Sequence, residues 1–198
     1  MPPDANIGLD LLDSRDALLC VIDVQHGFLA RLPDARRTEL THRIRFIVEV
    51  AARLAVPTIV TVEDAPLNGP TDPAVLGVLP PDCREFDKRV FGLMGQPDLA
   101  GRVAATGRRT AVLVGLETDV CVLHSAVGLA RAGWRSVIVS DACAAPGDAH
   151  AAGLERARAL GVETIHTKGL YYEWARSLAG LARLKAHPAV IAPPGLEL

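Results

Sequence analysis

Unbroken apolar runs alternate along the chain with segments whose apolar residues recur every three or four positions. The apolar runs have the length of strands and occupy residues 17–24, 57–63, 110–116, 135–141 and 162–167. Continuous apolar runs of this length are typical of strands that are buried on both faces of a parallel sheet. The pattern therefore predicts five such strands.

Amphipathic helices are expected between and after these strands. The clearest example runs from Arg36 to Leu54, where Ile44, Ile47, Val48 and Ala51 keep the helical spacing. The remaining helices are expected near residues 97–106, 121–132, 148–160 and 171–184. Short links between alternating strands and helices predict an α/β fold. We expect a three-layer sandwich with a mostly parallel sheet and helices on both faces.

The segment 64–96 interrupts the alternation and is rich in proline and glycine. It contains Lys88 and two phenylalanines. Long connections in compact domains are often functional, although a plain surface excursion is the simpler alternative. We expect a short extra strand near residues 83–87.

Composition narrows the class of protein. A chain of 198 residues that is 49% hydrophobic is long enough for one domain, which we assign to residues 1–198. The net charge of −2, without a Lys/Arg-rich tract, disfavours nucleic acid and anionic membranes as partners. No apolar run reaches membrane-helix length, and residues 1–10 lack a signal-peptide pattern. These features predict a cytoplasmic protein. Because no G-x-G-x-x-G motif follows a predicted strand, we also expect no cofactor.

Four cysteines are present: Cys20, Cys83, Cys121 and Cys143. None forms a C-x-x-C pair, so free thiols are expected. Cys121 follows the strand at 110–116 and begins the predicted helix at 121–132, within "GLETDVCVLHSA". A helix N-terminus lowers a thiol pKa, whereas nearby carboxylates raise it. The alternative for any one cysteine is a small buried hydrophobic residue.

Three stretches together resemble the isochorismatase-like cysteine hydrolases, which include nicotinamidases and carbamoylsarcosine amidases. They are "CVIDVQHGFL", "REFDKRVFGLM" and "VLVGLETDVCVLHSAVGLARAGWRSVIVSDACA". The resemblance spans residues 16–175 and follows the family order. It implies the family fold and the cleavage of a C–N bond in a small amide, ureido or carbamoyl compound.

The resemblance also implies roles for individual residues. Asp23, Lys88 and Cys121 match the family's catalytic triad, in which the carboxylate takes the thiol proton and the sulfur forms a thioester. The backbone N–H groups of Glu117 and Cys121 match the oxyanion hole. In the family a cis peptide precedes the first of these donors, which here is the Leu116–Glu117 bond.

Four further residues are expected to contact a small-molecule substrate by their position near these motifs. They are Gln25, Phe28, Phe91 and Thr118.

Aromatic residues gather near the C-terminus, at Tyr171, Tyr172 and Trp174. Packing onto the chain's own core is one explanation for this group. Because relatives in the family are usually oligomeric and aromatic residues are enriched at interfaces, we favour a homo-oligomer contact.

No metal is expected at the site. The stretch "TVEDAPLNGPTDP" holds Glu63 and Asp64 but lacks the histidines of the nicotinamidase metal site. Asp148 and His150 fall at a predicted helix start, where acids and surface histidines are common. His124 shares a helix face with Cys121, which disfavours it as a base across a pocket.

Two rival functions stay open. The chain could be a non-catalytic member of the fold that binds a small molecule or a partner. It could also be a thiol redox protein in which Cys143 approaches Cys121 in space.

Overall fold

The computed structural model describes residues 11–198. The expectation about a signal-peptide pattern concerns residues 1–10, which lie outside the described part of the chain. Six parallel strands form one sheet in the order β3-β2-β1-β4-β5-β6. The strands are β1 (Ala17–Ile22), β2 (Thr58–Glu63), β3 (Glu85–Lys88), β4 (Thr110–Leu116), β5 (Arg135–Ala144) and β6 (Glu163–Ile165). All five expected strands are confirmed, and β3 is the short extra strand.

The helices follow the expected alternation. They are α1 (His26–Leu29), α2 (Asp34–Arg53), α3 (Ala65–Asn68), α4 (Pro73–Leu76), α5 (Pro97–Ala105), α6 (Leu123–Arg131), α7 (Ala149–Ala159), α8 (Thr167–Ala175) and α9 (Leu178–Lys185). A π-helical turn (Thr118–Val122) joins β4 to α6, and a 3-10 turn (Leu93–Gly95) precedes α5. Within residues 11–198, no helix combines the length and apolar character needed to cross a bilayer.

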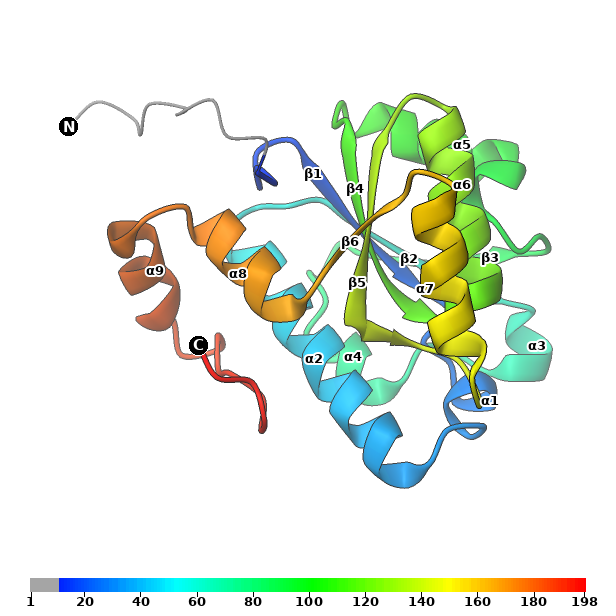
Figure 1. Ribbon diagram of the computed structural model, residues 1–198, viewed down its shortest axis with the longest axis horizontal. Coiled ribbons are helices and arrows are strands. Elements are labelled where there is room, and N and C mark those ends of the chain that lie inside the picture. The colour runs from blue at the N-terminus through cyan, green and yellow to red at the C-terminus, as the bar shows by residue number, and fades with distance from the viewer. Residues whose placement is uncertain (1–10) are drawn as a thin grey trace.

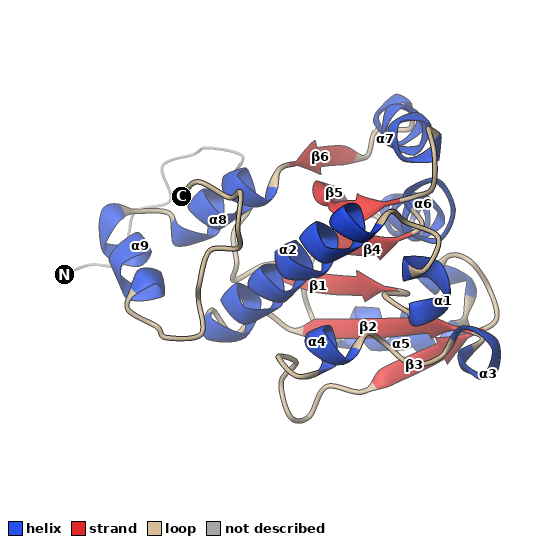
Figure 2. Ribbon diagram, turned by 90° about the horizontal axis from the view of Figure 1, so that it is seen from below, coloured by secondary structure: helices blue, strands red, loops and turns tan. Residues whose placement is uncertain are grey.

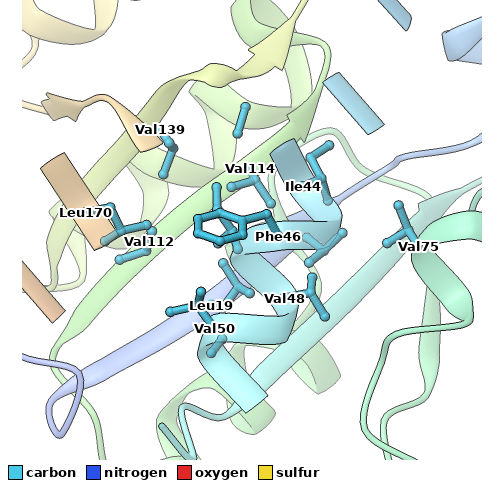
Figure 3. Close-up of a cluster of buried hydrophobic side chains, with 14 of the residues drawn as sticks. Leu19, Ile44, Phe46, Val48, Val50, Val75, Val112, Val114, Val139 and Leu170 are labelled. Atoms are coloured by element: carbon cyan, nitrogen blue, oxygen red, sulfur yellow. The ribbon is translucent and has the colours of Figure 1, made fainter. Parts of the chain in front are cut away.

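Helices cover both faces of the sheet, which confirms the three-layer α/β architecture (Figures 1 and 2). Successive strand residues point to opposite faces. Leu19 and Val21 of β1 belong to a core shared with α2 and α8, in which Phe46 packs against the sheet (Figure 3). Leu18 and Cys20 of the same strand belong to the opposite core, shared with α5, α6 and α7.

The register of the strands aligns their carboxyl ends at one edge of the sheet. Ile22 of β1 lies opposite Thr61 of β2 and opposite Gly115 of β4, and Glu63 of β2 lies opposite Lys88 of β3. Figure 2 shows α1 and α3 beyond the arrowheads of β1 and β2. Sites in parallel sheets form at this edge, so the register brings polar residues from four strands together.

The C-terminal helix expected at 171–184 is wrong in its extent. The chain forms two helices, α8 and α9, because Arg176 adopts a left-handed conformation with φ 62°. Ser177 then caps α9 by accepting a hydrogen bond from the Gly180 N–H at 3.1 Å.

The expectation of an aromatic interface near the C-terminus is also wrong for two of its three residues. Tyr171 and Trp174 are buried in the chain's own core, and the Tyr171 ring lies 5.4 Å from that of Phe46. Both residues lie on the face of α8 that packs toward α2 and β5. Tyr172 alone of the three is exposed.

Candidate active site

Four polar side chains converge beyond the carboxyl ends of the strands. The Lys88 Nζ lies 2.6 Å from Asp23 Oδ2 and 3.2 Å from Glu63 Oε2. The Cys121 thiol donates to the same Glu63 oxygen at 2.9 Å. Asp23, Glu63 and Cys121 each offer an atom within 4.8 Å of the other two. The three residues expected as a triad are thus neighbours in space, with Glu63 among them.

Asp23 follows β1 directly and is completely buried. Its backbone is left-handed, with φ 47°, a conformation that aspartate tolerates better than most residues. Oδ1 accepts a hydrogen bond from Thr61 Oγ1 at 2.9 Å, while Oδ2 faces Lys88. Burial raises the pKa of Asp23, and the ammonium of Lys88 and the hydroxyl of Thr61 oppose that rise.

Lys88 ends β3, an edge strand of the sheet, and is also completely buried. Burial disfavours the charged ammonium, but the adjacent Asp23 carboxylate outweighs it, so the pKa of Lys88 lies above its ordinary value. The two side chains form a desolvated ion pair. Removing one partner of such a pair strongly destabilises the folded protein, because the other charge stays buried without compensation.

Cys121 lies in the π-helical turn between β4 and α6 and is 2% exposed. From the sequence, a helix N-terminus would lower its pKa and nearby carboxylates would raise it. Burial raises the pKa of Cys121, and the Asp23 carboxylate and the hydrogen bond to Glu63 raise it further, with Lys88 opposing. A thiolate would add a third negative charge beside a single ammonium, so the resting residue is a neutral thiol.

Two features accompany the region expected to form the oxyanion hole. The Leu116–Glu117 peptide bond is cis. The Glu117 carboxylate, which could have disfavoured a thiolate, forms an ion pair with Arg31 at 3.2 Å. The charge of this carboxylate, four residues before Cys121, is therefore balanced by Arg31.

Gln25 does not present its side chain to a substrate, contrary to our expectation. It is completely buried, and its amide donates to the carbonyl oxygens of Glu63 at 3.1 Å and Gly69 at 2.6 Å. Its Oε1 accepts from the Glu63 N–H at 2.6 Å. Gln25 therefore holds the end of β2 in place.

Thr118 has a similar internal role. It is completely buried, and its hydroxyl shares a 2.8 Å hydrogen bond with His150 Nδ1. Burial, with a smaller contribution from Arg36, lowers the pKa of His150, which favours the neutral imidazole. Thr118 therefore fixes the turn that carries Cys121 against the start of α7.

The two phenylalanines expected at the substrate site differ in exposure. Phe28 is 6% exposed, and the Arg31 guanidinium lies 5.0 Å from the centre of its ring. Phe91 is 53% exposed and meets the ring of His124 edge-on at 5.8 Å. His124 is exposed, and the Cys121 thiol donates its hydrogen bond to Glu63.

The cluster of Asp23, Glu63 and Cys121 has donor atoms spaced closely enough for a metal ion. The ammonium of Lys88 already lies against both carboxylates and supplies a positive charge there. We therefore assign the cation position of this cluster to Lys88.

Glu63 is the site residue that the sequence did not reveal. It was recognised only as an acid in a stretch without histidines. The available signal was its position as the last residue of an apolar strand, at the edge where Asp23 also lies. The sheet order decides which strands lie beside Glu63. It therefore also decides which groups the Glu63 carboxylate contacts.

Comparison with known proteins identifies the family of the chain. The model of the Isochorismatase domain matches residues 17–169. The probable hydrolase YcaC of Escherichia coli is 26% identical over 181 residues, which cover 87% of this chain and 86% of that protein.

Solved structures show the same fold. The E. coli YcaC structure, described as an octameric hydrolase of unknown specificity, superposes with a TM-score of 0.81 at 24% identity and covers 88% of each chain. A pyrazinamidase/nicotinamidase from Streptococcus mutans superposes with a TM-score of 0.63 at 21% identity, over 75% of this chain and 99% of that one. With the family model matching most of its length, the chain belongs to the isochorismatase family of hydrolases.

Proposed function

We propose that this protein is a cysteine-dependent hydrolase that cleaves a C–N bond in a small amide, ureido or carbamoyl compound through a thioester. The observation that carries the proposal is the convergence of the Cys121 thiol with two carboxylates and the Lys88 ammonium. A nucleophile, proton acceptors and a cation within bonding distance are the parts that covalent acyl transfer requires.

The proposed reaction has two halves. In the first, the thiol proton passes to a carboxylate, Asp23 by the family assignment, and Sγ attacks the carbonyl carbon. The carbonyl π electrons move to oxygen, where the N–H groups of Glu117 and Cys121 would stabilise the charge. As the C=O bond reforms, the C–N bond breaks, and the amine leaves with a proton. Water then gives a proton to a carboxylate and attacks the thioester, which releases the acid and the thiol.

Several contacts favour hydrolysis over the rival functions. An ion pair buried away from water is costly unless its geometry is used or well compensated, and here it lies beside a nucleophile. All four cysteines are free. Cys143 is completely buried and donates to the Leu113 carbonyl oxygen, so it is poorly suited to exchange with Cys121.

The test is a panel of small amides, ureides and carbamoyl compounds, with release of ammonia or amine as the measurement. We expect Cys121→Ala to abolish release and Cys83→Ala, at a half-buried thiol outside the cluster, to retain it. Mass spectrometry of the wild type after rapid quenching should show the acyl group on Cys121. Amide hydrolysis that persists in Cys121→Ala would refute the covalent mechanism.

We also propose that copies of the chain assemble into a homo-oligomer. A relative of the same fold is described as octameric, and large apolar side chains such as Leu67, Leu178 and Ile191 are more than two-thirds exposed. Light scattering should return a mass several times the 21.0 kDa of one chain. A mass of one chain at micromolar concentration would contradict this proposal.

A further inference from the structure

Two carboxylates flank the thiol, and their surroundings differ. Asp23 is completely buried, with Lys88 on one oxygen and Thr61 on the other. Glu63 keeps 20% of its side chain exposed and accepts the thiol hydrogen bond directly. A group that moves a proton from the thiol to an entering substrate must contact the thiol and must also be reachable from outside. Glu63 meets both requirements, whereas Asp23 has no exposed surface.

Side-chain amides also hold the Glu63 backbone in place through several hydrogen bonds. Its N–H and its carbonyl are both bonded to Gln25, and the carbonyl accepts a further hydrogen bond from Asn68 Nδ2 at 2.9 Å. Both amide side chains are buried. Two buried side-chain amides directed at one residue are typical of support for a functional group, because catalytic geometry must be held closely.

We propose that Glu63 is a catalytic residue that carries the proton of Cys121 to the departing amine. This assignment rests on the proposed hydrolase function and deepens it. Asp23, held by Lys88 and Thr61, stays beside the thiol but does not reach the amine.

The proton transfers balance. When Sγ attacks the carbonyl carbon, the S–H bond breaks and the proton moves 2.9 Å to Glu63 Oε2. When the C–N bond breaks, its electron pair goes to nitrogen, and that nitrogen takes the proton from the Glu63 carboxylic acid. Glu63 is then a carboxylate again, and Lys88 at 3.2 Å stabilises its charge.

The test compares two leaving groups on one acyl group. The amide is the compound on which the wild type is most active in the panel, and its partner is the 4-nitrophenyl ester of the same acid. An amine needs a proton to leave, whereas nitrophenolate leaves as an anion. Single-turnover acylation is followed by release of amine or nitrophenolate in the wild type, in Glu63→Gln and in a control, Asp64→Asn. Asp64 is the neighbouring acid, but its carboxylate pairs with Arg89 at 2.7 Å.

We expect Glu63→Gln to slow acylation by the amide by about 10²–10⁴-fold, the usual contribution of general acid–base catalysis. The loss in the rate of acylation by the ester should be at least tenfold smaller than the loss for the amide. The reason is that Asp23 is still available to accept the thiol proton. Asp64→Asn should resemble the wild type with both compounds. Equal losses for amide and ester, or no loss for either, would overturn the role of Glu63.

A second measurement needs no substrate. The difference in thiolate absorbance near 240 nm between a protein and its Cys121→Ala variant reports the ionisation of Cys121. Glu63→Gln should lower the pKa of that thiol because a neighbouring negative charge is removed. An unchanged pKa in Glu63→Gln would overturn the contact itself. If Cys121→Ala still hydrolyses the amide, the proposed function fails together with this inference. If Cys121→Ala is inactive and Glu63→Gln shows equal losses, only the inference fails.

Discussion

Gln25 connects two strands at the site although it touches none of the reacting atoms in this arrangement. Its amide spans from β1 to the backbone of Glu63 and on to Gly69, with every polar atom engaged. A glutamine that is completely buried retains little freedom to move. Its side chain therefore sets the position of the Glu63 carboxylate relative to Cys121.

Replacing Gln25 by methionine keeps the shape of the side chain and removes three hydrogen bonds. Because the partly buried Glu63 N–H and Gly69 carbonyl lose their partners and the Glu63 carbonyl keeps only Asn68, we expect a loss of about 2–4 kcal/mol in the free energy of unfolding, measured with urea. Turnover of the amide should fall while its KM changes little, since the completely buried Gln25 offers a substrate no surface. The control is Gln96→Met, which removes exposed hydrogen bonds to Asp87 and Arg89 and should cost less than about 1 kcal/mol.

A wild-type kcat in Gln25→Met, at unchanged KM, would show that the end of β2 holds its position without this amide. A raised KM with an unchanged kcat would instead restore Gln25 to the substrate contact first expected of it.

At the level of strands, Gly115 lets β4 lie close to β1 near the site. Gly115 of β4 has φ 123°, and a Cβ there would lie within 1.9 Å of the Ile22 carbonyl oxygen. The pairing of β4 with β5 is also irregular between Leu113 and Gly115. This local geometry leads the chain into the cis peptide at Leu116–Glu117 and the turn that carries Cys121.

Gly115→Ala should therefore be severely destabilising. The added methyl group meets backbone of a completely buried strand, which cannot move aside cheaply, and the positive φ adds strain. We expect a loss of more than about 3 kcal/mol, measured by thermal or urea unfolding. The control is Gly101→Ala in α5, where a Cβ meets nothing within 4 Å and alanine should stabilise by about 0.5–1 kcal/mol. Similar stabilities for the two variants would contradict this account.

The sequence was most informative where one physical signal dominated. Long apolar runs located all five main strands, because burial on both faces leaves no room for polar residues. The break at Arg176 was missed, since an arginine carries no sign of a left-handed conformation. The π-helical turn at Cys121 was missed because its apolar spacing resembles that of an α-helix.

Some residues of the site were likewise visible in the sequence, and others only in the fold. Asp23, Lys88 and Cys121 were found through family motifs, but the place of Glu63 among them required the sheet order, in which β2 lies between β1 and β3. The direction of the Cys121 pKa required the burial of the thiol and the two carboxylates around it. Local sequence cannot supply contacts between residues that lie 58 positions apart, as Glu63 and Cys121 do.

For the whole molecule, buried thiols link stability to alkaline pH. Burial raises the pKa of Cys20 and of Cys143 from 9.0 to about 12, and both side chains are completely buried. Between these values the unfolded chain releases the two protons while the folded chain keeps them. The unfolded state then binds fewer protons, so the free energy of unfolding falls as the pH rises.

Each of these thiols should contribute a decline of about 1.4 kcal/mol per pH unit above about pH 9. Urea unfolding at about pH 9 and about pH 10.5 measures the slope, and Cys20→Ala should make it shallower by one thiol's share. The difference between the two proteins cancels the titration of lysines and tyrosines. Parallel slopes for wild type and variant would show that Cys20 ionises in the folded state.

The buried, neutral state of Cys121 also bears on oxidative damage. Peroxide attacks the thiolate and needs access to sulfur, and this residue offers neither while the site is at rest. Sulfenic acid should therefore form slowly on Cys121. A preparation stored in air without reductant should keep the Cys121 thiol reduced, until its proton passes to a neighbouring carboxylate.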